Sequence, residues 1–396
     1  MKLKATALAF AITFLLAIIT QLDLTGSADT ADDITITYIS AGDSASFVVL
    51  SDGSLWGWGS NNLGQLGDGT TTNRYYPVKL MDNVVSVSTS YAYTLAIRTD
   101  GSLWMWGLGE DGICLDTFKA INIIPPHKIM EDVIYASTVN AHFAAITSDG
   151  SLWTWGANHF AQLGDGTQIT RYDPVKIMED VVAVSLGFSH TMAIKSDGSL
   201  WGWGSANGVD TPDGAPEPYA IDLVEPIIGV YKNPIKIMED VIAVSAGASN
   251  TMAITSDNTL WAWGRDDFGI VSENGNDIHY IPPTQIMEDV IAISAGSRNP
   301  IVVQSDGSLW MWAEEKGDRF RDQLSPIFSE SLPVPVNVLN DVVAISSNPN
   351  RIMTSHILAL QVDGSLWSWG FNEYGQLGDG TTIARFTPAQ VMIDIQ

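Results

Sequence analysis

The sequence predicts an all-β protein, a seven-bladed β-propeller with four antiparallel strands in each blade. Three observations carry this prediction. The nine-residue phrase "SDGSLWGWG" at residues 51–59 occurs in seven variants, whose starting positions lie 48, 49, 48, 60, 49 and 57 residues apart. The chain contains 35 glycines and 17 prolines, and only 16% of its residues are charged. Its first and last segments each supply one part of a repeat. A β-rich repeat of about 50 residues is typical of propellers and solenoids.

The fourth copy shows how the strands are expected to follow one another. The expected order is "VVAVSLG" from Val181, "TMAIK" from Thr191, "LWGWG" from Leu200 and "NPIKIM" from Asn233. The letters "SDGS" between the second and third strands predict a hairpin, because Asp-Gly tolerates the positive φ that such turns require. A glycine-rich polar loop joins the third strand to the fourth. The "ED" pair at 239–240 then turns the chain into the next copy.

Each phrase contains two tryptophans separated by one residue. This spacing places both rings on the same face of their strand. Each ring can bury on the order of 200 Å², so we expect the pairs to fill the space between neighbouring blades. A sugar-binding platform is the alternative. The structural tryptophans are Trp56, Trp58, Trp104, Trp106, Trp153, Trp155, Trp201, Trp203, Trp261, Trp263, Trp310, Trp312, Trp367 and Trp369.

The two ends of the chain complete one another. "ITITYISAG" from Ile34 resembles a first strand with no preceding fourth strand, and "TPAQVMIDIQ" from Thr387 resembles a fourth strand with no following copy. We therefore expect pairing of the N- and C-terminal segments to close the ring, which would leave no exposed sheet edge at the junction.

The first 28 residues resemble a secretory signal peptide. Lys2 and Lys4 precede an uncharged, mostly apolar run over residues 5–20, and the small residues Gly26–Ala28 offer a cleavage site. The run is shorter than the about 20 residues that a membrane-spanning helix needs. We expect a signal at residues 1–28 and the propeller at residues 29–396. The sequence leaves open whether the signal is cleaved or kept as an anchor.

The composition excludes several kinds of partner. The formal net charge is −26, from 45 acidic and 19 basic residues. Such a chain repels phosphate backbones, so we expect no nucleic-acid partner. The acidity is typical of a soluble, self-repelling surface, with a cationic partner or scattered calcium as alternatives. Cys114 is the only cysteine, so the chain cannot form an internal disulfide, and we expect this thiol to be a small apolar filler.

Longer segments resemble a known family. "WGSNNLGQLGDGTTTNRYYPVKL" from Trp58, "WGANHFAQLGDGTQITRYDPVKI" from Trp155 and "WGFNEYGQLGDGTTIARFTPAQV" from Trp369 resemble the regulator of chromosome condensation repeat. The resemblance covers nearly all of the chain after about residue 32 and implies a seven-bladed propeller. The best-known nuclear members of this family bind chromatin and exchange nucleotide on a small GTPase. The fold is also similar to a secreted bacterial propeller that inhibits β-lactamases through loops on one face.

No sequence motif points to catalysis. The chain has no G-x-S-x-G, no H-E-x-x-H, no phosphate loop and no Cys/His metal spacing. The family's histidine before the hairpin is present as His142, His190 and His356, which we interpret as packed core residues. The aspartate of "LGDGT" occurs as Asp68, Asp165 and Asp379, which we interpret as a structural turn, because the D-x-D-x-D-G calcium ladder is absent. Whether calcium binds any loop stays open.

An antiparallel meander alternates its connections between two sides of a disc. The loops from strand one to two and from three to four lie on one side, here named the loop face. The Asp-Gly hairpins and the turns between copies lie on the other side, here named the turn face. The irregular segments fall on the loop face, between Trp203 and Pro234, between Trp312 and Pro335, and from Ser346 to His356. A uniform scaffold that presents variable loops is typical of recognition proteins. The alternative is drift in tolerant loops.

Candidate contacts on the loop face are mainly aromatic residues and arginines, the residue types that dominate binding hot spots. They are Tyr91, Phe188, Tyr219, Ile227, Tyr231, Arg319, Phe320, Arg321, Phe328 and Arg351.

These observations favour a non-enzymatic binding scaffold that is secreted, extracellular or associated with the cell surface. We expect it to bind a protein or another macromolecule as a monomer, with no cofactor, no metal and no membrane contact beyond the signal segment. The alternative is an extracellular hydrolase or lyase with carboxylates or a histidine at the central channel. A guanine-nucleotide exchange factor is the less favoured third interpretation.

Overall fold

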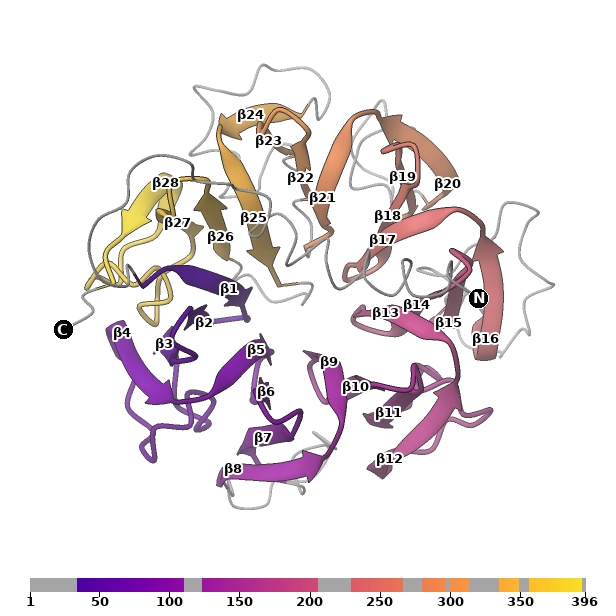
Figure 1. Cartoon of the computed structure of the whole chain (residues 1–396), viewed down its shortest axis with the longest axis horizontal. Helices are drawn as coiled ribbons and strands as arrows, with labels where there is room; N and C mark the ends of the chain where they lie inside the picture. The colour runs from indigo at the N-terminus through magenta and orange to yellow at the C-terminus, as the bar shows by residue number, and fades with distance from the viewer. Residues whose placement is uncertain are drawn as a thin grey trace, which may run out of the picture.

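The protein is a closed ring of seven small sheets, each built from four consecutive antiparallel strands (Figure 1). The computed structural model describes residues 34–109, 123–205, 229–265, 280–296, 300–312, 335–348 and 356–393. Every regular element in these ranges is a β-strand. The predicted fold class, a seven-bladed β-propeller, is confirmed.

The strands follow the repeat blade by blade, from the innermost strand to the outermost. Blade 1 is β1 (Ile36–Ala41), β2 (Ala45–Leu50), β3 (Leu55–Gly59) and β4 (Arg74–Met81). Blade 2 is β5 (Val84–Thr89), β6 (Tyr93–Arg98), β7 (Leu103–Leu108) and β8 (Ile123–Met130). Blade 3 is β9 (Val133–Val139), β10 (His142–Thr147), β11 (Leu152–Gly156) and β12 (Arg171–Met178). Blade 4 is β13 (Val181–Leu186), β14 (His190–Lys195), β15 (Leu200–Ser205) and β16 (Val230–Met238).

The last three blades repeat this order. Blade 5 is β17 (Val241–Ala246), β18 (Asn250–Thr255), β19 (Leu260–Arg265) and β20 (Tyr280–Met287). Blade 6 is β21 (Val290–Ser294), β22 (Ile301–Gln304), β23 (Leu309–Met311) and β24 (Val336–Leu339). Blade 7 is β25 (Val342–Ser347), β26 (His356–Gln361), β27 (Leu366–Gly370) and β28 (Arg385–Val391). The expected fourth strand of copy four was too short, since β16 starts three residues before Asn233 and includes Tyr231.

The turn face is built from two kinds of tight turn that hydrogen-bond to each other. Gly150 has φ +80° and Asp180 has φ +61°, so both turns need the left-handed region that glycine, asparagine and aspartate tolerate best. The amide of Val181 donates to the carbonyl of Gly150 over 2.9 Å. Each of the first six hairpins makes the equivalent bond to the following turn between blades. The predicted placement of both turn types on one face is confirmed.

The hydrophobic core is divided into seven clusters, one for each seam between neighbouring blades. The two tryptophans of a pair face the same seam, as strand parity predicts, but they differ in burial. Trp203 is fully buried between blades 3 and 4, whereas Trp201 is partly exposed and donates its indole N–H to the hairpin hydroxyl of Ser199 over 2.9 Å. The second tryptophan of every pair is therefore the main filler of its seam.

A row of inner-strand serines links the blades near the channel. Ser185 accepts the amide of Ala246 in the next blade over 2.9 Å, and Ser245 accepts the amide of Ala295 over 2.9 Å. Ser346 of blade 7 accepts the amide of Ala41 in blade 1 over 2.9 Å. These bonds satisfy buried backbone groups that face the neighbouring blade instead of a strand partner.

The ring closes between blade 7 and blade 1, as predicted, but the terminal strands do not share a sheet. β1 pairs with β2, and β28 pairs with β27. Ile39 of β1 and Val391 of β28 instead lie in one core cluster, together with Trp58. Side-chain packing and the Ser346 hydrogen bond therefore join the two ends, because each blade already contains its own four strands.

Candidate interface on the loop face

The structure describes three of the ten predicted contact residues. Tyr91 lies in the loop between β5 and β6 and is 45% exposed. Phe188 lies in the loop between β13 and β14 and is half-buried, and its amide donates to the carbonyl of Gly247 in blade 5 over 3.2 Å. Tyr231 is in β16 and packs against the clusters of two seams, so it contributes to the scaffold.

The other seven predicted contacts lie outside the described residues. They are Tyr219, Ile227, Arg319, Phe320, Arg321, Phe328 and Arg351.

Exposed aromatic residues gather at the loop-face end of the described blades. Sequence reasoning found Tyr91 and missed four others. The exposed large aromatics in the described ranges are Tyr75, Tyr76, Tyr91, Phe160 and Tyr172, and each lies in a loop of this face or within the first three residues of the outer strand that follows one. The sequence already contained this signal, since "RYYP" and "RYDP" each begin four residues after the end of "LGDGT".

Three loops of this face reach into the next blade and form hydrogen bonds with it. We name residues 64–70, 161–167 and 375–381 the clasp loops. In the second one, the carbonyl of Gln162 accepts the Trp203 indole N–H over 2.9 Å and the Thr191 hydroxyl over 2.8 Å. Gly164 has φ +75°, and a Cβ on it would lie 2.6 Å from the Trp203 Nε1. Only glycine therefore fits where the loop passes over the ring.

The other two clasp loops repeat this geometry. Gln65 O accepts Trp106 Nε1 over 2.9 Å and Thr94 Oγ1 over 2.8 Å, and Gln376 O accepts Trp58 Nε1 over 2.9 Å and Ser46 Oγ over 2.7 Å. The clasp loop of blade 7 thus also helps to close the ring.

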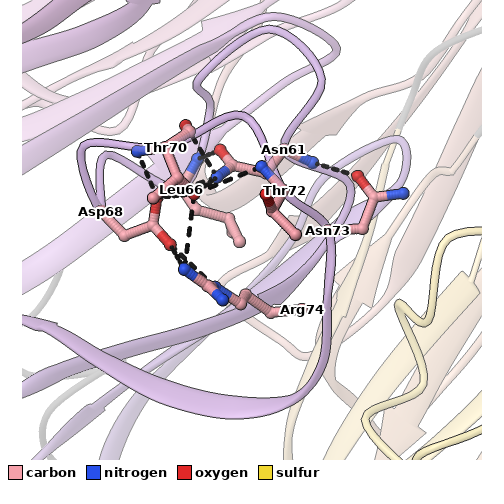
Figure 2. Close-up of polar contacts among 7 residues, drawn as sticks. All are labelled: Asn61, Leu66, Asp68, Thr70, Thr72, Asn73 and Arg74. Atoms are coloured by element: carbon pink, nitrogen blue, oxygen red, sulfur yellow. Dashed lines mark hydrogen bonds and ion pairs between the residues drawn. The ribbon is translucent and has the colours of Figure 1, made fainter.

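An asparagine and an ion pair give each clasp loop its shape, as Figure 2 shows for the loop of blade 1. The Asn61 Nδ2 donates to Asp68 Oδ1 over 2.9 Å, and Asn61 Oδ1 accepts the Leu66 amide over 3.0 Å. Arg74 donates to Asp68 Oδ2 from Nε over 2.8 Å and from Nη2 over 2.5 Å. Burial alone would raise the pKa of Asp68, but hydrogen bonds from Thr70, Arg74 and Asn61 outweigh it and hold the pKa below its usual value.

The same ion pair occurs in the other two clasp loops, between Arg171 and Asp165 at 2.7 Å and between Arg385 and Asp379 at 2.5 Å. In each clasp loop an arginine therefore neutralises the aspartate that the sequence analysis considered as a calcium ligand. This pairing favours the interpretation of the loop as a structural turn. Among the described residues no group of three or more His, Cys, Asp or Glu side chains could hold a metal ion.

The three family histidines lie inside the seams. His142, His190 and His356 are at most 1% exposed, and their Nε2 atoms lie 3.2 Å from Thr191 Oγ1, 3.0 Å from Thr251 Oγ1 and 2.6 Å from Ser46 Oγ. Because Thr191 and Ser46 donate their own protons to clasp-loop carbonyls, His142 and His356 must donate from Nε2. Burial lowers the pKa of His142 to about 3, of His190 to about 4 and of His356 to about 3.

The described inner strands of the channel carry no charged or histidine side chains. These seven strands, β1, β5, β9, β13, β17, β21 and β25, contain no Asp, Glu, His, Lys or Arg. Burial raises the pKa of Tyr38 and Tyr135, which keeps these phenols protonated. The described inner strands therefore lack the carboxylates or histidine that a hydrolase or lyase at the channel would need.

The turn face has a different chemistry from the loop face. Exposed acidic residues occupy its hairpins and its turns between blades, for example Asp149, Glu179 and Asp180. A hydrogen bond from the Thr147 side chain, followed by bonds from the Ser151 amide and hydroxyl, lowers the pKa of Asp149 to about 2. The large apolar side chains exposed near this face are aliphatic, such as Val85 and Val362. Among the described residues, the exposed large aromatic side chains therefore lie at the loop face and not at the turn face.

Comparison with known families agrees with the repeat. Models described as "Regulator of chromosome condensation (RCC1) repeat" match residues 52–97, 149–194 and 363–395, and also residues 36–65, 84–113, 134–162, 181–209 and 241–270. Together these ranges include more than half of the chain. The chain belongs to the regulator of chromosome condensation (RCC1) repeat family. The clasp loops of blades 1, 3 and 7 lie within RCC1-repeat matches.

One curated relative and two solved structures are similar to the chain at low identity. The chain is 28% identical over 153 residues to human E3 ubiquitin-protein ligase HERC2, which is 38% of this chain but only 3% of the relative. Its fold is similar to Saccharomyces cerevisiae Prp20p, described with its binding to Gsp1p and histones, with a TM-score of 0.67, 18% identity and coverage of 92% and 87% of the two chains. Yeast RCC1 (Prp20) bound to Kap60 gives a TM-score of 0.68 at 17% identity, covering 94% and 90%. These likenesses show a seven-bladed RCC1-type propeller.

Proposed function

We propose that this RCC1-repeat protein is a non-catalytic binding scaffold, secreted or held at the cell surface, that binds a protein or another macromolecule through its loop face. The observation that carries the proposal is the concentration of exposed aromatic side chains at the loop-face end of the blades. Tyrosine and tryptophan are enriched in binding hot spots because they combine a large apolar area with a polar group.

The scaffold beneath these side chains supports the same proposal. Tyr75 and Tyr76 lie beside the blade-7 clasp loop, since a Cβ on Gly375 or Gly380 would collide with their side chains. The Tyr75 carbonyl also accepts the Gly380 amide over 3.0 Å. A surface held by such contacts loses little conformational entropy on binding. The proteins Gsp1p, histones and Kap60, which appear with the yeast relatives, indicate that propellers of this family can serve as protein-binding surfaces.

The test compares two triple variants. The mature chain is used to isolate a partner from culture supernatant and cell-wall extract, and the affinity of that partner is then measured by calorimetry. Tyr76→Ser, Tyr91→Ser and Tyr172→Ser together should weaken binding by at least about tenfold, since each removes an exposed aromatic contact. The matched control is Val85→Ser with Ile242→Ser and Val362→Ser, away from the loop face, which should leave affinity unchanged. Weaker binding by the control variant, with unchanged binding by the tyrosine variant, would assign binding to the turn face and refute the proposal.

Export is tested separately, because residues 1–28 lie outside the described residues. We propose that these residues direct secretion. Among the residues that are described, none forms a helix able to cross a membrane. Fractionation of expressing cells and N-terminal sequencing should find a chain that starts at Asp29, outside the cytosol. Recovery of a chain that starts at Met1 only in the cytosol would refute this part of the proposal.

A further inference from the structure

One layer of the channel wall has two chemically different sides. It consists of the third residue of each inner strand and is here named the axial layer. Blades 1 to 3 place hydroxyl groups in this layer, whereas blades 4 to 7 place only methyl groups there. In chain order its residues are Tyr38, Ser86, Tyr135, Ala183, Ala243, Ala292 and Ala344. Figure 1 shows their strands, β1, β5, β9, β13, β17, β21 and β25, around the axis of the ring.

The axial layer borders accessible space inside the ring. All seven of its side chains are partly exposed, although they lie on the innermost strands. The preceding residue, one step closer to the turn face, is 48% exposed as Val85 and 37% exposed as Ile242. The seven hairpins and the six turns between blades at this end are all within the described ranges. The channel therefore offers accessible apolar surface at its turn-face end.

The hydroxyl groups of blades 1 to 3 are not used to hold the described fold together. Among the described residues, Tyr38 Oη, Ser86 Oγ and Tyr135 Oη have no hydrogen-bond partner, and none of these oxygens is fully buried. Burial raises the pKa of Tyr38 and the Tyr135 phenol raises it further, so the two phenols lie near each other and stay protonated. A protonated phenol can donate one hydrogen bond and accept another. Three consecutive blades therefore supply unpaired hydroxyl groups to one side of the layer.

The charge of the protein restricts what this layer can bind. The inner strands contain no acidic, basic or histidine side chain, so no group on them could neutralise an ion that has left water. The formal net charge of −26 also repels anions. The methyl groups of blades 4 to 7 favour contact with an apolar surface. These properties together select an uncharged ligand with one apolar and one polar side.

We propose that the axial layer binds a small uncharged molecule that enters from the turn face. Its apolar part, such as an aromatic ring, packs on the alanines of blades 4 to 7. Its hydroxyl, carbonyl or amide group forms hydrogen bonds with Tyr38, Ser86 and Tyr135. This site is separate from the aromatic surface of the loop face and does not rest on the function proposed for that surface.

The first test compares three probes of similar size and shape. At neutral pH, phenylacetamide is uncharged, phenylacetate is an anion and phenethylammonium is a cation. Saturation-transfer NMR with the mature chain should detect phenylacetamide, and the Kd of each ion should be at least about tenfold higher, because the inner strands offer no counter-charge. No binding of phenylacetamide, or tighter binding of either ion, would overturn the proposal.

The second test locates the probe in the channel. Tyr38→Phe together with Tyr135→Phe keeps both rings and removes two hydroxyl groups, so it should weaken phenylacetamide binding about tenfold. Tyr172→Phe is the matched control, since it removes a phenol hydroxyl that lies outside the channel, and it should leave the Kd unchanged. Ala292→Leu adds bulk to the methyl side and should abolish binding. Urea unfolding checks that each variant is folded, and the phenylalanine variants still decide the outcome if the leucine variant is not.

Two results separate this inference from the proposed function. Equal binding of phenylacetamide by the wild-type chain and the double phenylalanine variant would show that the axial layer is not its site. The loop-face variant with Tyr76→Ser, Tyr91→Ser and Tyr172→Ser should bind phenylacetamide as the wild-type chain does. Loss of binding in that variant would place the probe on the loop face and overturn the axial site, whatever the same variant does to the macromolecular partner.

Discussion

Mild acid should destabilise this protein through its three buried histidines. His142, His190 and His356 are neutral in the folded state, with pKa values of about 3, 4 and 3 against an ordinary value of 6.5. Between the folded pKa values and the ordinary value of 6.5, the unfolded chain therefore binds more protons than the folded chain. The contribution of the three histidines to the free energy of unfolding is complete above about pH 6.5. It decreases as the pH falls from 6.5 toward the folded pKa values and does not decrease further below them.

The magnitude follows from linkage. Each histidine contributes a loss of about 1.4 kcal/mol per pH unit once the unfolded imidazole is charged, so the loss is about 2 kcal/mol per histidine at pH 5. The three together give about 6 kcal/mol, which is comparable to the total stability of many domains. The structural reason is that each Nδ1 is buried without a partner, so protonation would place an N–H where no acceptor lies.

The assay is chemical denaturation at pH 7.5 and pH 5.0. Replacing all three histidines by asparagine, the residue that blade 5 uses as Asn250 at this position, should remove most of the difference between the two pH values. His159→Asn is the matched control, since His159 is exposed in a loop, and it should leave the difference unchanged. The reasoning is refuted if the triple variant loses as much stability on acidification as the wild-type chain.

Three further predictions concern the clasp loops. Gly67→Ala and Gly69→Ala both place alanine at positive φ, but a Cβ at Gly67 would lie 2.6 Å from the Trp106 Nε1 while none lies within 4 Å at Gly69. Gly69→Ala should cost about 1 kcal/mol and Gly67→Ala at least about 2 kcal/mol more, measured by urea unfolding, and equal costs would contradict the proposed contact. Asp165→Asn should destabilise by about 1 to 3 kcal/mol, because it breaks the ion pair to Arg171. Adding calcium or a chelator should leave the melting temperature of the wild-type chain unchanged, and a rise with calcium would show that the loops bind this ion.

The sequence alone was sufficient to predict the blade. Alternation along "VVAVSLG", the Asp-Gly pair and the two-residue spacing of Trp201 and Trp203 are local properties, and hydrogen bonding within a four-stranded sheet depends on little else. Seven repetitions and the complementary ends of the chain then favour a ring, because each blade has two faces to cover. The strand order, the two faces of the disc and the closure between blades 7 and 1 could all be inferred from this pattern.

The tertiary structure decided which groups meet across a seam. The Trp58 indole N–H bonds to the carbonyl of Gln376, 318 positions away in the sequence, and no local pattern encodes that contact. Packing between blades also buries Trp203 more than Trp201. Tyr231 lies in β16 and not in a loop, and the buried indole Nε1 of Trp369 has no hydrogen-bond acceptor among the described residues. Side-chain parity fixes the face on which a residue lies, whereas its burial and partners depend on the neighbouring blade, which is positioned only when the ring has closed.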